Sequence, residues 1–209
     1  MGSPCVADEA SKLQPVRVQG SALAHWLFTR LGWTIHFDGI PARQGVLIVY
    51  PHTSNWDFFI LILAKWAIGL PVKFWGKDSL FKVPVLGRWM RWVGGVPVER
   101  HVNQGAVGAM TRRLMESKQA DSFFWLALAP EGTRKWLPGW RSGFYQVALG
   151  AQVPLGICCV NFPQKTVRVT EFLHLTGQVN EDMQRIARAL QGAVGKNPAQ
   201  AAPIQLISK

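Results

Sequence analysis

The spacing of apolar and polar residues predicts strands and helices that follow one another along the chain. A run that is apolar throughout, typical of a strand buried on both faces of a sheet, occupies residues 45–50, and 122–128 and 153–160 are predicted to be further strands. Further strands are predicted at 33–39, 72–75 and 93–98, and an antiparallel pair or extended segment at 165–176. Helical spacing of apolar residues predicts helices at 54–68, 103–117 and 143–149 and a last helix from Asn180. This order predicts an α/β fold with a mostly parallel central sheet flanked by helices.

The N-terminal part of the chain predicts a leader and one short helix. Residues 1–20 show no clear period and are expected to form a loose leader, whereas 21–31 have the spacing of a short amphipathic helix. No linker divides the rest, so residues 21–209 are expected to form a single domain. The longest apolar runs, 58–64 and 123–130, are shorter than the roughly 18 to 20 residues that span a bilayer. Without a signal-peptide pattern, a cytoplasmic setting is expected.

Charge and tryptophan content narrow the class of partner. The 209 residues carry 23 Lys and Arg against 12 Asp and Glu, a net charge of +11, which favours an anionic partner. Nucleic acid, an anionic lipid surface and a phosphorylated small molecule all qualify. The basic residues are scattered rather than gathered on one helix or between stacking aromatics, which disfavours nucleic acid. The ten Trp residues, each with an apolar body and a polar N–H, favour contact with a lipid interface.

The cysteines and most histidines give no metal or cofactor site. Cys158 and Cys159 lie in an apolar run and are expected to be core residues, and no CxxC spacing is present. The histidines other than His52 have no ligand-spaced partners, so no metal and no cofactor is predicted.

Three polar clusters each follow a predicted strand: His52 to Asp57, Arg100, and Glu131 to Arg134. Ligands of parallel α/β sheets bind beyond the carboxyl ends of the strands, so these clusters should converge on one pocket. His52 is suited to accept a proton near neutral pH, and Asp57 can orient it across a loop-to-helix bend. Ser54 has no G-x-S-x-G elbow, which favours a base that activates an acceptor hydroxyl directly. The alternative is a surface histidine beside a helix-capping aspartate.

The second cluster reads Pro-Glu-Gly-Thr-Arg. Glu131 and Arg134 flank a Gly-Thr turn whose backbone N–H groups could bind phosphate or an oxyanion. Alone, this cluster could also be an ordinary turn closed by an ion pair, and Arg100 could be a solvated charge at a strand edge.

Taken in order, these motifs resemble the glycerolipid acyltransferase family, whose bacterial members acylate lysophosphatidic acid. The similarity covers roughly residues 51–160. The family's His-x-x-x-x-Asp is matched by His52 and Asp57, its Gly-x-x-aromatic-x-x-Arg block by 94–100 with Pro97 in the aromatic position, and its Glu-Gly-Thr-Arg by 131–134. A Val-Pro-apolar block is matched loosely by 153–155, and the family's Lys-x-x-Leu-Phe segment begins here at Lys77.

The resemblance implies a role for each matched residue. His52 would be the general base and Asp57 would orient it, while Arg100 and Arg134, with Lys77, would bind the acceptor's phosphate. Glu131 would orient Arg134 or an acceptor hydroxyl, and Gly132, beside Thr133, would lend its N–H to the oxyanion. Arg141 stands where the family commonly has a basic residue.

The function implied is transfer of a fatty acyl group from acyl-CoA or acyl carrier protein to a lysophospholipid, with lysophosphatidic acid as the expected acceptor. Two alternatives stay open: another lysolipid acceptor such as an aminoacyl lysolipid, and a non-catalytic lipid-binding module. The 21–31 helix, the 136–141 stretch and the basic surface are expected to hold the protein peripherally at the cytoplasmic face of the membrane.

Overall fold

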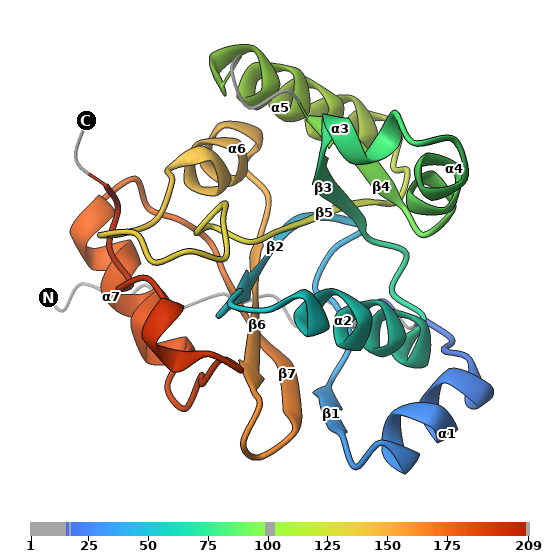
Figure 1. Ribbon diagram of the computed structural model, residues 1–209. Coiled ribbons are helices and arrows are strands. Elements are labelled where there is room, and N and C mark those ends of the chain that lie inside the picture. Colours follow the sequence, from blue (N-terminus) through green and yellow to red (C-terminus); the bar gives the residue numbers. More distant parts are fainter. Residues whose placement is uncertain (1–15, 17, 99–102, 208–209) are drawn as a thin grey trace, which may run out of the picture.

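The computed structural model describes Val16 and residues 18–98 and 103–207, and its centre is a seven-stranded sheet (Figure 1). The strands are β1 (Thr34–Phe37), β2 (Gln44–Tyr50), β3 (Lys73–Lys77), β4 (Gly95–Val98), β5 (Phe124–Leu128), β6 (Leu155–Asn161) and β7 (Thr166–Leu173). β2 and β6 are buried at every residue, including the polar Gln44 and Asn161 at their ends, and for β2 the apolar run 45–50 predicts this burial.

The sheet is mostly parallel, which confirms the prediction. Its strand order is β1-β7-β6-β2-β5-β3-β4. The five strands from β6 to β4 run parallel to one another, whereas β7 pairs antiparallel with β6, and β1 pairs parallel with β7. The carboxyl ends of β2 and β5, after which two of the predicted clusters come, therefore lie side by side at one edge.

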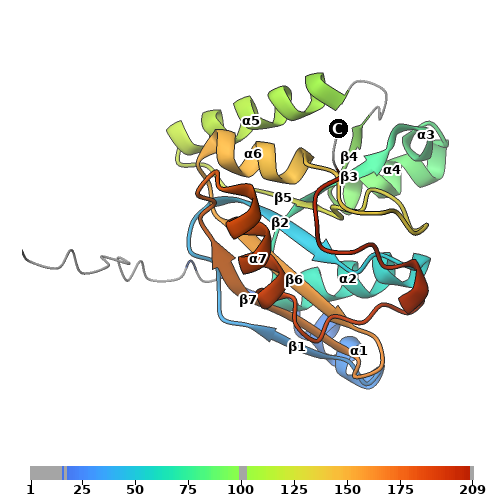
Figure 2. The same cartoon turned by 90° about the vertical axis from the view of Figure 1, so that its left-hand side faces the viewer.

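Helices cover both faces of the sheet and enclose two apolar cores (Figure 2). The helices are α1 (Ala22–Arg30), α2 (Asn55–Ile68), α3 (Asp78–Phe81), α4 (Pro84–Trp92), α5 (Asn103–Gln119), α6 (Gly143–Ala151) and α7 (Val179–Ala189), followed by the 3₁₀ turn Pro198–Gln200. Side chains of α5, α6 and α7 pack against one face, and those of α1 and α2 against the other.

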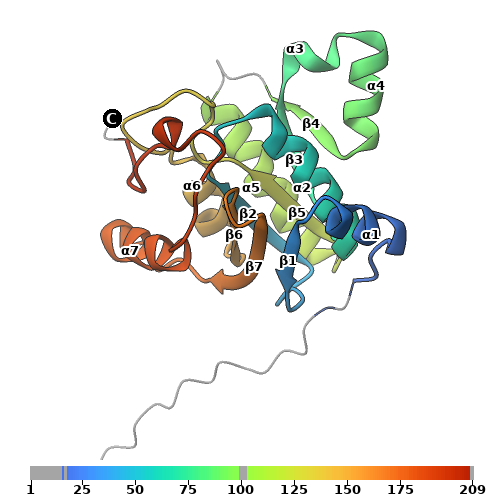
Figure 3. The same cartoon turned by 60° about the horizontal axis from the view of Figure 1, so that its bottom comes forward.

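The described residues just before α1 are held against the rest of the domain. Residues 1–15 and 17 lie outside the described residues, but Val16 pairs with Ile40, and the Ser21 N–H donates to the Trp66 carbonyl oxygen at 2.9 Å. A Cβ on Gly20 would collide with the Ala67 carbonyl, so only glycine allows this approach. Figure 3 shows α1 lying beside α2, where Phe28 and Trp33 are buried.

Two predictions were wrong or incomplete. Trp140, part of the 136–141 stretch expected at the membrane, is fully buried and packs 5.1 Å from the Tyr50 ring, while Trp136 is exposed. Helices α3 and α4 were not predicted. Leu80 of α3 and Val85 and Trp92 of α4 are apolar yet exposed, beside the exposed Arg88 and Arg91, so the apolar residues of these helices are not confined to one buried face. Among the described residues, no helix is long and apolar enough to cross a membrane.

Candidate active site

His52 and Asp57 meet where β2 passes into α2. Ser54 caps α2 in a capping box, and Asp57, in the first turn, turns its carboxylate back over the loop. Asp57 Oδ2 accepts the N–H groups of Thr53 and Ser54 at 2.7 and 2.8 Å and lies 3.3 Å from His52 Nδ1. Asp57 is fully buried, and its Oδ1 has no hydrogen-bond partner among the described residues. One carboxylate thus caps the helix and orients the imidazole.

Glu131 fixes the main chain of the His52 loop. Its Oε2 accepts the His52 backbone N–H at 2.6 Å, and its Oε1 accepts that of Ala202 at 3.0 Å. Burial raises the pKa of the Glu131 carboxyl, and the two backbone hydrogen bonds oppose that rise. Glu131 is buried, and within the described residues its carboxylate forms no hydrogen bond or ion pair with Arg134, so its expected role toward Arg134 or an acceptor hydroxyl stays a prediction.

The turn after Glu131 differs from expectation at Gly132. Its φ of +67° is a conformation that glycine adopts without strain, and its N–H donates to the Ala129 carbonyl at 3.0 Å. The N–H is therefore already used within the turn, and the expected oxyanion contact is not supported. Thr133 lines the cavity, and its Oγ1 accepts the Lys135 N–H at 3.3 Å. Arg134 also lines the cavity, and its Nε donates to the Ser54 carbonyl at 3.1 Å.

The structure gives different positions for the basic residues expected to bind phosphate. Arg100 lies outside the described residues, and Lys77 is the last residue of β3. Arg141, absent from the predicted site, lines the cavity, and its side chain lies against Gly132: a Cβ there would come within 2.9 Å of Arg141 Cδ and Nε. The available sequence signal was its position, at which the family commonly has a basic residue, in the connection between β5 and α6 at the carboxyl edge of the sheet.

A cavity of about 1080 Å³ opens beside His52 and reaches both faces of the sheet. Its lining residues surround a fork between β3 and β5, which pair only at Lys73–Leu126 and Phe74–Ala127. Beyond these pairs, Trp75 stays with β4 and Leu128 stays with β2, so the two strands separate.

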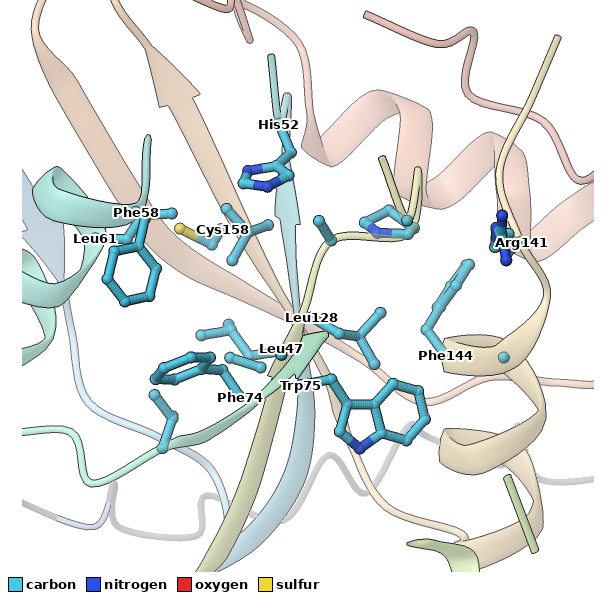
Figure 4. Close-up of a pocket in the computed structure, with 18 of the residues that line it drawn as sticks. Leu47, His52, Phe58, Leu61, Phe74, Trp75, Leu128, Arg141, Phe144 and Cys158 are labelled. Carbon is cyan, nitrogen blue, oxygen red and sulfur yellow. The ribbon is translucent and has the colours of Figure 1, made fainter. Parts of the chain in front are cut away.

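The cavity has two arms, one on each face of the sheet. The arm here named the α2 arm is lined by side chains from the α1–α2 face, among them Leu47, Leu61, Phe74 and Cys158, and by Phe58, whose ring contacts that of Phe74. The arm here named the α6 arm is lined by side chains from the opposite face, among them Trp75, Val107, Leu128, Leu137 and Phe144. In Figure 4, Phe58, Leu61 and Cys158 of the α2 arm lie to the left of His52, and Trp75, Leu128 and Phe144 of the α6 arm lie to its lower right. The imidazole thus lies where an apolar chain could enter either arm.

The C-terminal segment closes the site from outside and was not predicted. Tyr50 Oη donates to the Ala202 carbonyl at 3.0 Å, and burial, with the nearby Glu131 charge, raises the pKa of Tyr50 to about 12. Asn197 Nδ2 donates to the Thr53 carbonyl at 2.9 Å. Residues flanking His52 are therefore held by a segment far along the chain.

No metal centre is formed by the described part of the chain, where no group of three His, Cys, Asp or Glu side chains gathers. Cys158 and Cys159 are free thiols buried in the two cores, and burial raises the pKa of both.

Fold and site together define an α/β protein with a carboxylate-backed histidine at the mouth of an apolar cavity large enough for long aliphatic chains. Residues 33–160 match the family model named Acyltransferase, and the chain belongs to this acyltransferase family.

Named relatives agree with that membership. A protein of Arabidopsis thaliana, "Probable 1-acyl-sn-glycerol-3-phosphate acyltransferase 5", is 36% identical over 123 residues, which cover 54% of this chain and 32% of the relative. A chloroplastic 1-acyl-sn-glycerol-3-phosphate acyltransferase of Brassica napus is 30% identical over 107 residues, covering 50% and 30%. These matches span about a third of the relatives' length. The crystal structure of the 1-acyl-sn-glycerophosphate acyltransferase from Thermotoga maritima has the same fold, with a TM-score of 0.55 and 18% identity over 80% of this chain and 73% of that one.

Proposed function

We propose that this protein transfers a fatty acyl group from an acyl thioester, acyl-CoA or acyl carrier protein, to the hydroxyl of lysophosphatidic acid in phospholipid synthesis. The observation that carries the proposal is the buried Asp57 carboxylate 3.3 Å from His52 Nδ1, at the mouth of a cavity with apolar walls and two guanidinium groups. The names of the relatives favour the same acceptor.

His52 is the general base in this proposal. Because Nδ1 faces Asp57, the nitrogen left for the acceptor is Nε2, which has no hydrogen bond within the described residues. Nε2 takes the hydroxyl proton as the oxygen attacks the thioester carbonyl carbon, and Asp57 stabilises the resulting imidazolium. The tetrahedral intermediate then expels the thiolate, which takes the proton from Nε2. The products are the ester and the free thiol, and no metal or cofactor takes part.

Arg134 and Arg141 bind the acceptor's phosphate in this proposal, with Arg100 and Lys77 as predicted further contacts. Guanidinium groups suit this task because their planar donors match phosphate oxygens in pairs. The Ser54 carbonyl holds Arg134 through Nε only, so its two terminal nitrogens remain for a ligand. Two cations beside the base also favour a phosphate acceptor over an aminoacyl lysolipid.

The site is proposed to work at a membrane surface, peripherally and on the cytoplasmic side. The outward side of α1 exposes Leu23, Trp26, Leu27 and the following Leu31, an apolar surface beside which Arg30 lies. A helix of this composition inserts shallowly among lipid headgroups, and the net charge of +11 adds attraction to anionic lipids.

Release of free thiol from a panel of acyl-CoAs and acyl carrier proteins, with and without lysophosphatidic acid, tests the function. We expect acceptor-dependent release in the wild type and its loss in His52→Ala. His36→Ala, an exposed histidine on β1, is the matched control and should keep full activity. Thiol release that persists in His52→Ala would overturn the assignment of the base. Lipid binding without transfer from any donor would identify a non-catalytic lipid-binding module, and transfer only to aminoacyl lysolipids would replace the acceptor.

A further inference from the structure

The two arms of the cavity differ in shape and in chemistry. The α2 arm runs from the fork beneath β2 and β6 to Val167 and Val169 of β7 and to Ile35 of β1. From β5 to β1 there are four interstrand steps of about 4.8 Å, so this arm is about 19 Å long. At the far end Val167 and Val169 are almost fully buried and Ile35 is half-buried, from which we infer that this end is blind. A blind apolar arm of this length suits one extended acyl chain.

The α6 arm lies on the opposite face and is not blind. Its deep part is lined by Trp75, Leu128 and Phe144, whereas Arg141 and Gln146, which also line it, are exposed. Gln146 Nε2 donates to Ser142 Oγ at 3.0 Å, so polar groups line its outer part. Apolar depth combined with a polar, cationic mouth suits an amphiphile whose headgroup stays outside.

The proposed reaction brings two aliphatic chains to His52, the one transferred and the one that the acceptor already carries. A cavity of about 1080 Å³ is at or above the roughly 300–1,000 Å³ range of single small-molecule pockets, so it has room for parts of both. If the donor chain fills the blind α2 arm, the acceptor's chain needs another apolar surface within reach of the phosphate. Arg141, next in sequence to Ser142, stands at the mouth of the α6 arm.

We propose that the α6 arm is a second lipid-chain site, which binds the acyl chain of the lysophospholipid acceptor while its phosphate contacts Arg141. The inference rests on the proposed function and adds to it a specificity site for the acceptor. The fork between β3 and β5 lets the two chains lie on opposite faces of the sheet and meet only at their polar ends, beside His52. Acceptor-chain and donor-chain selectivity then depend on different residues.

Gly143, the first residue of α6, offers a way to fill the α6 arm alone. It lines the cavity, and a Cβ built there has only an ordinary contact, 3.8 Å from Val107 Cγ2. Gly143→Leu therefore projects a side chain into the arm without a backbone clash. Gly143→Ala, which adds only the Cβ, is the graded control. Leu61→Trp fills the α2 arm in the same way and is the crossed control.

The first test compares two substrate panels in mixed micelles of constant composition. One panel varies the acceptor from hexanoyl to oleoyl lysophosphatidic acid, and the other varies the donor from octanoyl- to stearoyl-CoA. Burying one methylene group of the acceptor chain should change kcat/KM about fourfold. In Gly143→Leu the new side chain blocks a few positions of that chain, so the ratio of kcat/KM for the oleoyl acceptor to that for the hexanoyl acceptor should fall about tenfold or more. The donor profile should not change. Leu61→Trp should change the donor profile and leave the acceptor profile unchanged.

Unchanged acceptor selectivity in a folded Gly143→Leu, or a shift of its donor profile, would overturn the second-site proposal. A readout independent of turnover separates this failure from failure of the proposed function. Lysophosphatidic acid with a photoreactive diazirine at the end of its chain should label peptides of β3, α5 and α6. An acyl-CoA with the same group at the end of its chain should label α2, β7 or β1, which line the α2 arm and its far end. Labelling of α2 by the acceptor would refute the proposal even if transfer occurs. Correct labelling without any transfer would retain the second site and refute the reaction.

Discussion

Replacing Asp57 by asparagine isolates the charge behind His52 while leaving the loop intact. Oδ2 accepts two backbone N–H groups, and Oδ1 has no hydrogen-bond partner among the described residues. An asparagine can place its carbonyl oxygen where Oδ2 lies and its NH₂ group where Oδ1 lies, so the cap of α2 is kept. The unpaired Oδ1 of Asp57 is then replaced by an unpaired NH₂ nitrogen, and the buried negative charge of the carboxylate is removed. We expect the free energy of unfolding to change by less than about 1 kcal/mol.

Activity should fall far more than stability. At an effective dielectric constant of about 20, unit charges separated by the 3.3 Å between His52 Nδ1 and Asp57 Oδ2 interact by about 5 kcal/mol. Spreading of the imidazolium charge over the ring and the 20% exposure of the His52 side chain weaken this interaction to about 3 kcal/mol. At 1.36 kcal/mol per factor of ten, kcat/KM in Asp57→Asn should drop about a hundredfold.

The assay is acceptor-dependent thiol release, with thermal unfolding measured on the same preparations. Asp121→Asn is the matched control, since Asp121 forms an exposed pair with Arg43 on a distant loop and should keep wild-type activity. Asp57→Ala should also lose stability, by about 2–5 kcal/mol, because the N–H groups of Thr53 and Ser54 lose their acceptor. An Asp57→Asn protein that keeps more than a third of wild-type kcat/KM would refute the reasoning.

Three further predictions concern the loops and the surface. Burial raises the pKa of Glu131, so its contribution to the free energy of unfolding is present below the unfolded-state pKa and is lost as pH rises through the folded-state pKa. Glu131→Gln should remove this dependence of the free energy of unfolding on pH and should lower kcat. Gly132→Ala should destabilise the fold by about 1 kcal/mol and raise KM for lysophosphatidic acid, because φ is +67° and the new Cβ displaces Arg141; an unchanged KM would contradict the phosphate contact. Leu23→Ser combined with Trp26→Ser should weaken binding to anionic vesicles at least tenfold in sedimentation assays, whereas Val179→Ser on α7 should not; equal binding would exclude α1 as the anchor.

The sequence predicted the parts of the site that depend on local geometry. His52 and Asp57 are five positions apart across a strand-to-helix bend, so their contact follows from the end of β2 and the start of α2. The buried strands could also be predicted, because runs such as 45–50 are apolar at nearly every position.

The remaining features depend on contacts that spacing cannot reveal. Glu131 bonds to Ala202, 71 residues away, and no pattern in the chain announces that a carboxylate will serve backbone N–H groups instead of its neighbour Arg134. The N–H of Gly132 is taken by a turn whose closure depends on the exact dihedral angles. Trp136 and Trp140 lie in the same short stretch, and the burial of Trp140 depends on its packing against Tyr50, 90 residues earlier in the chain.

The closure of the site by the C-terminal segment has a consequence for biosynthesis. Tyr50 and Ala202 are 152 residues apart, and Glu131 needs Ala202 to occupy its second oxygen. A ribosome that adds about 5–20 residues per second reaches Ala202 about 8–30 s after Tyr50. During that interval the nascent chain contains the His52–Asp57 pair but not the segment that fixes the histidine loop. A chain that stops before Ala202 should therefore contain His52 and Asp57 and still lack the contacts through which Ala202 fixes Tyr50 and Glu131 beside the His52 loop.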